Sequence, residues 1–404
     1  MRIGSKAAVS VAAAALALAV LVSACLPADP ADSTPSVPAA DPRDAPFARA
    51  RELSEGLSLE AACGQLIMTG IGGRGVLDQP SRLLLSDLPA GAVMLFGFNI
   101  PPEAGDLRPS LDLAQEIARG SGAGIPLFVA VDHEGGEVFR FRDGVTRLPS
   151  ARALGDAGSE AVAGAGATAG RELRALGISL NLAPVAEAWD ARNGGFLGTR
   201  SFSADPAEAG SLAAAFLTAL QAEGIAAAAK HYPGNGSEDP HKAVPVVEAS
   251  PEEIASFYDP PFRRVIEAGA AAVMLSHAMF PALDPDSPAS LSPAVIGRLK
   301  GELGFRGIVL TDDVAMKALS GSGGAGASAV AAVKAGADMV MASGGRIARE
   351  AYGALLDAVR SGELPEARVR DAAARILAQK IRFGLIDGLD RTDSELGRGQ
   401  DKQD

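Results

Sequence analysis

The side chains best suited to catalysis in this sequence are its histidines and the carboxylates beside them. Two of the four histidines, His231 and His241, lie in the short segment 230–241, which also contains a lysine and two carboxylates. The glycines and prolines of this segment break regular structure, so we expect a loop after His231. A loop rich in titratable groups, directly after the apolar run 224–229, is a candidate site.

Two arrangements in the sequence suit proton transfer and nucleophilic attack. In Asp239-Pro240-His241 the carboxylate can fix the tautomer of the imidazole and prepare it for proton transfer near neutral pH. Asp312, at the end of another apolar run, can act as a nucleophile. One nucleophilic carboxylate and one proton donor that flank a bond are what a retaining glycosidase requires.

Several other chemistries have no support in the sequence. No His and Cys spacing typical of zinc is present, so no metal site is expected from the spacing. The glycine-rich segment 321–326 lacks the Lys-Ser/Thr of a phosphate-binding loop, and there is no Gly-x-Ser-x-Gly motif. A Schiff base on Lys230, as in a lyase or aldolase, remains an alternative.

The elements that must position these residues form a repeating pattern. Short apolar runs alternate with longer segments of helical period, which is typical of a parallel sheet covered by helices. We expect eight strands, at 65–70, 92–96, 127–132, 178–185, 226–231, 271–277, 307–312 and 337–342. The main helices are expected at 111–118, 161–176, 206–221, 251–268, 289–302, 325–334, 347–360 and 366–383. Eight such units predict an α/β protein with a single (β/α)8 barrel, and an open doubly wound sheet is the alternative.

Polar residues collect at the carboxyl ends of these predicted strands, where barrel enzymes carry their active sites. All four histidines lie at such ends or in the loop that follows. The polar strand ends are Asp132-His133-Glu134, Lys230-His231, Ser276-His277 and Thr311-Asp312-Asp313.

Composition and the N-terminus indicate where the protein works. The formal net charge is −12 and no basic run occurs, so nucleic acid is not an expected partner. Residues 1–24 resemble an export signal, and Leu21-Val22-Ser23-Ala24-Cys25 resembles a bacterial lipobox, in which Cys25 receives lipid. We therefore expect a protein anchored to the cell membrane by lipid alone, facing outside the cytoplasm. An ordinary secretory signal is the alternative.

Four segments follow from this pattern. They are a signal peptide (1–24), a lipid-anchored flexible linker (25–46), the barrel domain (47–388) and a disordered tail (389–404). The second cysteine, Cys63, lies in an apolar context and is expected in the core. We expect a monomer.

Five ordered motifs give the chain a resemblance to glycoside hydrolase family 3, and within it to the bacterial β-N-acetylglucosaminidase branch. They are VDHEGG (131–136), GTRSF (198–202), KHYPG (230–234), DPH (239–241) and TDD (311–313). The resemblance extends from about residue 50 to 388. It implies removal of terminal β-linked N-acetylglucosamine, commonly from cell-wall (peptidoglycan) fragments such as muropeptides, without a cofactor.

The resemblance also implies a role for individual residues. Asp312 corresponds to the nucleophile that forms a glycosyl-enzyme, and His241, paired with Asp239, to the general acid/base. The positions that correspond to sugar-binding residues are Asp132, Arg140, Arg200, Lys230 and His231.

The chain departs from the family pattern in its acid/base loop, which is about two residues shorter and has Asn235 and Pro240 where histidine and serine are usual. Glu137 stands where arginine is frequent. Two alternatives therefore stay open beside hydrolysis: phosphorolysis at the same site, and a surface lipoprotein that binds glycan without cleaving it.

Overall fold

The computed structural model describes residues 44–319 and 321–386. Its eight strands are all parallel and close into one barrel in sequence order, β1 to β8, with β8 paired to β1. This confirms the predicted (β/α)8 barrel and excludes the open doubly wound sheet. The strands are β1 (Ile67–Gly70), β2 (Ala92–Leu95), β3 (Phe128–Val131), β4 (Leu180–Asn181), β5 (Ala226–Tyr232), β6 (Ala272–Leu275), β7 (Ile308–Asp313) and β8 (Met339–Ala342).

Each strand coincides with one predicted apolar run, and only β5 and β7 extend one residue beyond theirs. The agreement arises because strands buried on both faces consist of continuous apolar residues. The largest difference is at 178–185, where only the two residues of β4 pair with both neighbours. Two pairings contain irregularities, one between β5 and β6 beside His231 and one between β7 and β8 beside Asp312. Such irregularities redirect side chains at the rims of barrels, and here they occur on the two strands that carry candidate catalytic residues.

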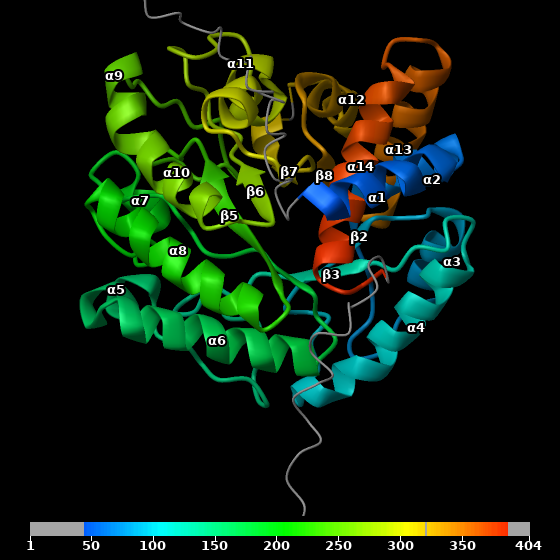
Figure 1. The fold of residues 1–404 in the computed structure, drawn as a ribbon, viewed down its shortest axis with the longest axis horizontal. Coiled ribbons are helices and arrows are strands. Elements are labelled where there is room, and N and C mark those ends of the chain that lie inside the picture. Colours follow the sequence, from blue (N-terminus) through cyan, green and yellow to red (C-terminus); the bar gives the residue numbers. More distant parts are fainter. Residues whose placement is uncertain (1–43, 320, 387–404) are drawn as a thin grey trace, which may run out of the picture. The chain divides into compact units, whose positions relative to one another are not determined.

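Helices surround the strands, as Figure 1 shows. The α-helices are α1 (Asp44–Gly56), α2 (Leu59–Gln65), α3 (Gln79–Asp87), α4 (Arg108–Gly120), α5 (Ala151–Ala157), α6 (Ser159–Ala175), α7 (Gly194–Leu197), α8 (Pro206–Ala222), α9 (Pro251–Glu253), α10 (Asp259–Glu267), α11 (Pro293–Gly297), α12 (Ala325–Ala335), α13 (Gly345–Arg360) and α14 (Glu366–Arg382). Short polar side chains cap several of them; Asp205, for example, accepts from the N–H of Glu208 ahead of Pro206 at the first turn of α8.

Two segments predicted as single helices are interrupted by π-helical turns. In 251–268 the turn is η2 (Ile254–Tyr258), between α9 and α10. In 289–302 the 3-10 turn η3 (Ala289–Leu291) is followed by α11 and the π-helical turn η4 (Arg298–Glu302). A periodic apolar pattern predicts that a helix exists but does not distinguish the hydrogen-bond register of its individual turns.

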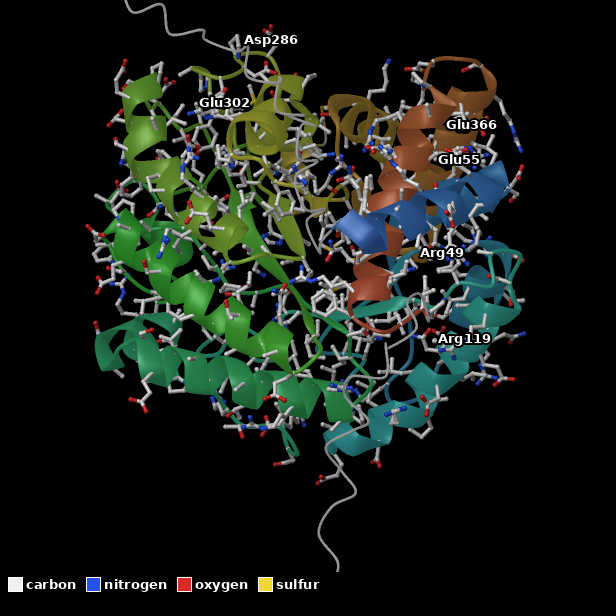
Figure 2. The ribbon with its side chains drawn as sticks, viewed as in Figure 1. Arg49, Glu55, Arg119, Asp286, Glu302 and Glu366 are labelled. Atoms are coloured by element: carbon white, nitrogen blue, oxygen red, sulfur yellow. The ribbon has the colours of Figure 1, made fainter. Side chains whose placement is uncertain are left out.

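The first and last described helices lie side by side, blue and red in Figure 1. Arg370 of α14 donates to the backbone oxygen of Ser54 at 2.6 Å and to the carboxylate of Glu366 at 2.5 Å. Glu55 of α1 lies 3.9 Å from the same guanidinium, and Figure 2 labels both glutamates at this junction. The pair of helices therefore joins the two ends of the described chain.

Three of the four predicted segments fall wholly or largely outside the described residues. The signal peptide (1–24) and tail (389–404) lie outside the described residues, as do Cys25 and the linker up to residue 43. Helix α1 begins at Asp44. Cys63 is fully buried in α2, as expected. Among residues 44–319 and 321–386, no helix combines the length and apolar character needed to cross a membrane.

Candidate active site

Strand β5 delivers Lys230 into a cluster of carboxylates at the carboxyl end of the barrel. The Nζ of Lys230 lies 2.6 Å from Oδ1 of Asp132 and 2.7 Å from Oε1 of Glu134, both from the loop that follows β3. Burial by itself would lower the pKa of Lys230, but the two carboxylates raise it above the ordinary lysine value. The ammonium group is therefore retained, which disfavours a Schiff-base role because that chemistry needs a neutral amine.

Two arginines complete this cluster. Arg200 binds Glu134 with two hydrogen bonds, of 2.8 Å from Nε and 3.0 Å from Nη2. Glu134 is buried, yet Lys230 and Arg200 hold its pKa well below the usual range for glutamate, so it stays ionised. Arg140 approaches Asp132 at 3.4 Å, and its Nε is buried without a hydrogen-bond partner in the described structure. Four of the five predicted sugar-binding residues thus lie in one network.

The fifth, His231, is held by a residue that the sequence reasoning missed. Glu187 is buried, and its Oε1 lies 2.8 Å from Nδ1 of His231 and 3.1 Å from the backbone nitrogen of His231. The same carboxylate accepts from the backbone and side-chain amides of Asn235, at 2.7 Å and 3.1 Å. Glu187 therefore fixes both His231 and the start of the loop after β5. Glu187 lies two residues beyond the predicted strand 178–185, and the other candidate site residues also lie at or just after the ends of predicted strands.

Asp312, near the end of β7, is partly buried and accepts from the backbone N–H of Asp313 at 2.8 Å. Burial would raise the pKa of Asp312, but the imidazoles of His277 and His231, this N–H and the Lys230 ammonium together lower it. Asp313 instead serves the backbone, since its carboxylate accepts from the N–H of Ala315 at 3.0 Å. Asp312 is thus an ionised carboxylate at the barrel mouth.

The two remaining histidines near the strand ends have structural contacts. His277 is buried and spans from the hydroxyl of Ser290, at 2.7 Å, to the backbone oxygen of Asp313, at 3.0 Å. His133 packs against Phe139 and Phe141, and burial lowers the pKa of His133 to about 4. Both rings are thus engaged in contacts within the protein.

The loop after β5 carries the predicted acid/base pair. Nδ1 of His241 lies 2.8 Å from Oδ1 of Asp239, which also accepts from the backbone N–H of His241 at 3.0 Å. The His241 side chain is 68% exposed. The backbone oxygen of Pro240 accepts from the N–H of Ala318 at 3.3 Å, in the 3-10 turn η5 (Lys317–Leu319) that follows β7. The loop is thereby attached to the segment that follows Asp312.

An open cleft of about 640 Å³ lies beside this loop. Its walls come from the turn after β3, from α7 and from the loop after β5. The lining residues are Glu137, Val138, Gly195, Phe196, Arg200, Ser237, Glu238, Asp239, His241, Lys242 and Ala243. The cleft thus joins Arg200 to the pair Asp239 and His241, whereas Asp312 and Asp132 are not among its lining residues.

This arrangement can bind a polyhydroxylated ligand and carry out acid/base and nucleophilic chemistry. Charged groups form the stronger hydrogen bonds to hydroxyls, and several of them converge here. Within residues 44–319 and 321–386, no group of three or more His, Cys, Asp or Glu side chains could hold a metal ion.

Fold and site together define a (β/α)8-barrel enzyme with its polar residues gathered at the carboxyl ends of the strands. The family described as "Glycosyl hydrolase family 3 N terminal domain" matches residues 58–379, and the chain belongs to this family. The expectation of a glycoside hydrolase is thereby confirmed.

Relatives in this family are similar over most of the barrel. A protein named Beta-hexosaminidase from Tolumonas auensis is 38% identical over 277 residues, which cover 67% of this chain and 80% of that protein. Another Beta-hexosaminidase, from Thioalkalivibrio sulfidiphilus, is 36% identical over 277 residues, or 66% of this chain and 77% of that protein.

Solved structures show the same fold. A glycoside hydrolase family 3 beta-N-acetylglucosaminidase from Paenibacillus sp. str. FPU-7 superposes with a TM-score of 0.78 at 37% identity, over 81% of this chain. This chain spans only 63% of that longer protein. Beta-N-acetylhexosaminidase from Beutenbergia cavernae DSM 12333 has a TM-score of 0.74 at 31% identity, over 80% of this chain and 98% of its own.

Proposed function

We propose that this protein is a retaining, exo-acting glycosidase that removes terminal β-linked N-acetylglucosamine, with fragments of the peptidoglycan cell wall as its natural source of substrate. The observation that carries the proposal is the Asp312 carboxylate, held ionised at the mouth of a barrel whose neighbouring strand ends supply a buried hydrogen-bonding network. The names of the relatives, beta-hexosaminidase and beta-N-acetylglucosaminidase, support the choice of sugar.

In the proposed reaction, an oxygen of Asp312 attacks the anomeric carbon as the bond from that carbon to the glycosidic oxygen breaks. His241, protonated and oriented by Asp239, gives its proton to the leaving oxygen. Neutral His241 then takes a proton from water, whose oxygen attacks the anomeric carbon and releases Asp312. Two displacements at one carbon leave its configuration unchanged.

The sugar itself is assigned to the buried network. Lys230 and Asp132 meet at 2.6 Å and can each form a further hydrogen bond to a ring hydroxyl, and Arg140, whose side chain is 36% exposed, stands beside Asp132. Arg200, which lines the cleft, and His231, which is held by Glu187, are assigned to the same sugar. The loop that carries His241 lies open to solvent, so catalysis requires it to approach Asp312 when substrate binds.

Hydrolysis of 4-nitrophenyl β-N-acetylglucosaminide tests the assignment. Wild type should release the chromophore, and Asp312→Ala should lose about 10³- to 10⁵-fold in kcat because the nucleophile is gone. His241→Ala should lose less, since nitrophenolate needs little protonation, and more on a disaccharide with a poor leaving group.

The controls separate this reading from its alternatives. Circular dichroism should show that both variants are folded. A rate that requires added phosphate would identify a phosphorylase, and binding of the sugar without turnover in folded wild type would leave only a glycan-binding protein. An equal loss for His241→Ala on good and poor leaving groups would contradict its role as the acid.

We further propose that the protein is exported and anchored to the membrane through lipid on Cys25. The sequence Leu21-Val22-Ser23-Ala24-Cys25 supports this, although it lies outside the described residues. Expressed with its N-terminus, the chain should partition into detergent extracts of membranes and carry diacylglycerol on Cys25 by mass spectrometry. Cys25→Ala should abolish both results; a soluble wild-type product cleaved elsewhere would disprove lipid attachment.

A further inference from the structure

Glu137 occupies a defined place at the tip of a turn that lines the cleft. The turn 134–138 is closed by two backbone hydrogen bonds, from Glu134 N–H to Val138 oxygen at 3.2 Å and from Val138 N–H to Gly135 oxygen at 3.1 Å. Glycines with φ of +89° and +57° at 135 and 136 permit this turn. Since Glu134 at its base is fixed by Lys230 and Arg200, Glu137 at its tip is held over the cleft.

The cleft lies on the leaving-group side of the site. The general acid must stand next to the glycosidic oxygen, and His241 lines the cleft. The groups assigned to the N-acetylglucosamine ring, Asp132 and Lys230, are not among its lining residues. On the proposed function, the part of the substrate beyond the cleaved bond lies along the cleft, and Glu137 belongs to the wall formed by the turn after β3, not to the loop that must move.

The charges that line the cleft leave a negative surplus. Its two cations already have carboxylate partners, Arg200 with Glu134 and Lys242 with Asp239 at 3.3 Å. In the described part of the chain, Glu137 and Glu238 form no ion pair, and the contact of Glu137 is a 3.3 Å hydrogen bond from the hydroxyl of Thr199. Glutamate is ionised at neutral pH, so the cleft presents two carboxylates without a counter-ion, and of these Glu137 is the one held by the fixed turn.

We propose that Glu137 determines specificity for the leaving group: it selects against substrates that carry a carboxylate next to the cleaved bond and favours neutral leaving sugars. This inference rests on the proposed function and names its substrate class. Within cell-wall fragments it favours those in which the acid beside the cleaved bond is absent or blocked as an amide. A second N-acetylglucosamine is equally acceptable by charge.

Electrostatics sets the size of the effect. Two like charges several ångströms apart at an exposed site repel enough to change a rate constant about three- to tenfold at low ionic strength. Salt screens exposed charges, with a Debye length of about 10 Å at 0.1 M and about 3 Å at 1 M. Discrimination should therefore be strong in dilute buffer and weak in concentrated salt.

A matched pair of substrates measures this discrimination: the 4-carboxyphenyl and 4-carbamoylphenyl β-N-acetylglucosaminides. They differ in charge but hardly in shape, and the quantity of interest is the ratio of kcat/KM for the anionic to the neutral substrate. Glu137→Gln should raise this ratio about three- to tenfold over wild type in dilute buffer, with little difference left at 1 M NaCl. Comparing enzymes cancels the intrinsic difference between the two leaving groups.

The control is Glu116→Gln on α4, an exposed glutamate that makes the same change in net charge away from the cleft and should leave the ratio unchanged. If Glu137→Gln does not fold, the wild-type ratio must still rise with salt. An unchanged ratio in folded Glu137→Gln, or a wild-type ratio independent of salt, would overturn the inference. Wild type that cleaves neither substrate would refute the proposed function and with it this inference. If wild type cleaves the neutral substrate, the proposed function stands, and the ratios then test the role of Glu137 alone.

Discussion

Both ends of the barrel bury charged side chains, but only one end can use them on a ligand. At the carboxyl ends of the strands, Lys230 joins Asp132 and Glu134, and the Asp132 side chain keeps 17% of its surface exposed. At the opposite end Asp338, the residue before β8, is fully buried. It accepts from Lys300 at 2.8 Å, from Arg368 at 2.6 Å and from the backbone of Val309 at 2.9 Å.

The difference lies in what remains available after folding. Donors of the protein fill the acceptor positions of Asp338, so this carboxylate contributes to stability and offers no acceptor to a ligand. At the other end, Asp312 has one backbone donor and is only partly buried, and the side chains of Arg140 and Asp132 remain 36% and 17% exposed. A buried charge therefore indicates a functional site only when some of its hydrogen-bonding capacity points toward a space that a ligand can enter.

The sharpest test of this comparison removes Asp338. Asp338→Ala leaves Lys300 and Arg368, whose side chains are only 20% and 18% exposed, without this fully buried carboxylate. We expect a loss of about 3–5 kcal/mol in the free energy of unfolding, measured by urea denaturation. Turnover per folded molecule at low temperature should stay within about twofold of wild type, since no substrate contacts this end.

Asp371→Ala is the matched control, because Asp371 pairs with Arg368 in the same cluster but is 35% exposed. A partly exposed pair contributes little, so the expected loss is about 1 kcal/mol or less. Equal losses for the two variants, or a large fall in turnover of folded Asp338→Ala, would remove the distinction between the two ends.

The second test changes Glu187, which acts through His231 and Asn235. Glu187→Gln keeps the shape but loses the charge and one acceptor, so His231 and the acid/base loop lose their fixed positions. By analogy with groups that orient catalytic ligands, kcat should fall about 10- to 50-fold, with a smaller change in KM.

A readout specific to the loop separates positioning from general destabilisation. Lys242 is 81% exposed, and limited trypsin cleavage after it reports how often the loop opens. Glu187→Gln should be cut faster at this bond than wild type, while cleavage elsewhere is unchanged. If kcat falls with no change in loop cleavage, Glu187 does not act by positioning the loop.

The sequence predicted the barrel and most of this site because both depend on local patterns. Apolar runs define buried strands, and the rule that chemistry lies at their carboxyl ends placed Asp132, Lys230 and Asp312 at one face. The structure brings Asp132 and Lys230 into contact, and it places the Lys230 ammonium where it helps to lower the pKa of Asp312.

What the sequence could not show depends on contacts between distant segments. Glu187 and His231 are 44 positions apart, and nothing in the spacing indicates that they meet at 2.8 Å. Asp338 lies within a predicted strand and Lys380 within a predicted helix, and the apolar pattern of neither segment shows that its charged residue would be buried. The π-helical turns in two predicted helices were missed for a different reason, because side-chain periodicity does not record the register of backbone hydrogen bonds.

The smallest expected effect concerns Lys380, a lysine without a carboxylate partner at the amino end of the barrel. It is fully buried, with its Nζ 2.7 Å from Oε1 of Gln65 and 5.8 Å from the Phe128 ring. Burial lowers the pKa of Lys380 well below the usual lysine value. Lys380→Met removes this desolvated amine, and we expect a gain of about 1–2 kcal/mol at pH 7, because folding of the variant no longer requires the amine to lose its proton and its hydration.

The pH dependence identifies the cause of that gain. Between the lowered folded pKa of Lys380 and the unfolded value of about 10.4, the unfolded chain binds a proton that the folded protein does not. Wild-type stability should therefore gain, from this group, up to about 1.4 kcal/mol per pH unit as pH rises through that window. Urea denaturation from pH 7 to 9 should show the advantage of Lys380→Met shrinking, while Lys334→Met, whose lysine is 46% exposed, shows no such trend. If the difference in unfolding free energy between Lys380→Met and wild type does not vary with pH, Lys380 is charged in the folded protein. The amino end of the barrel would then hold a buried cation without a carboxylate partner.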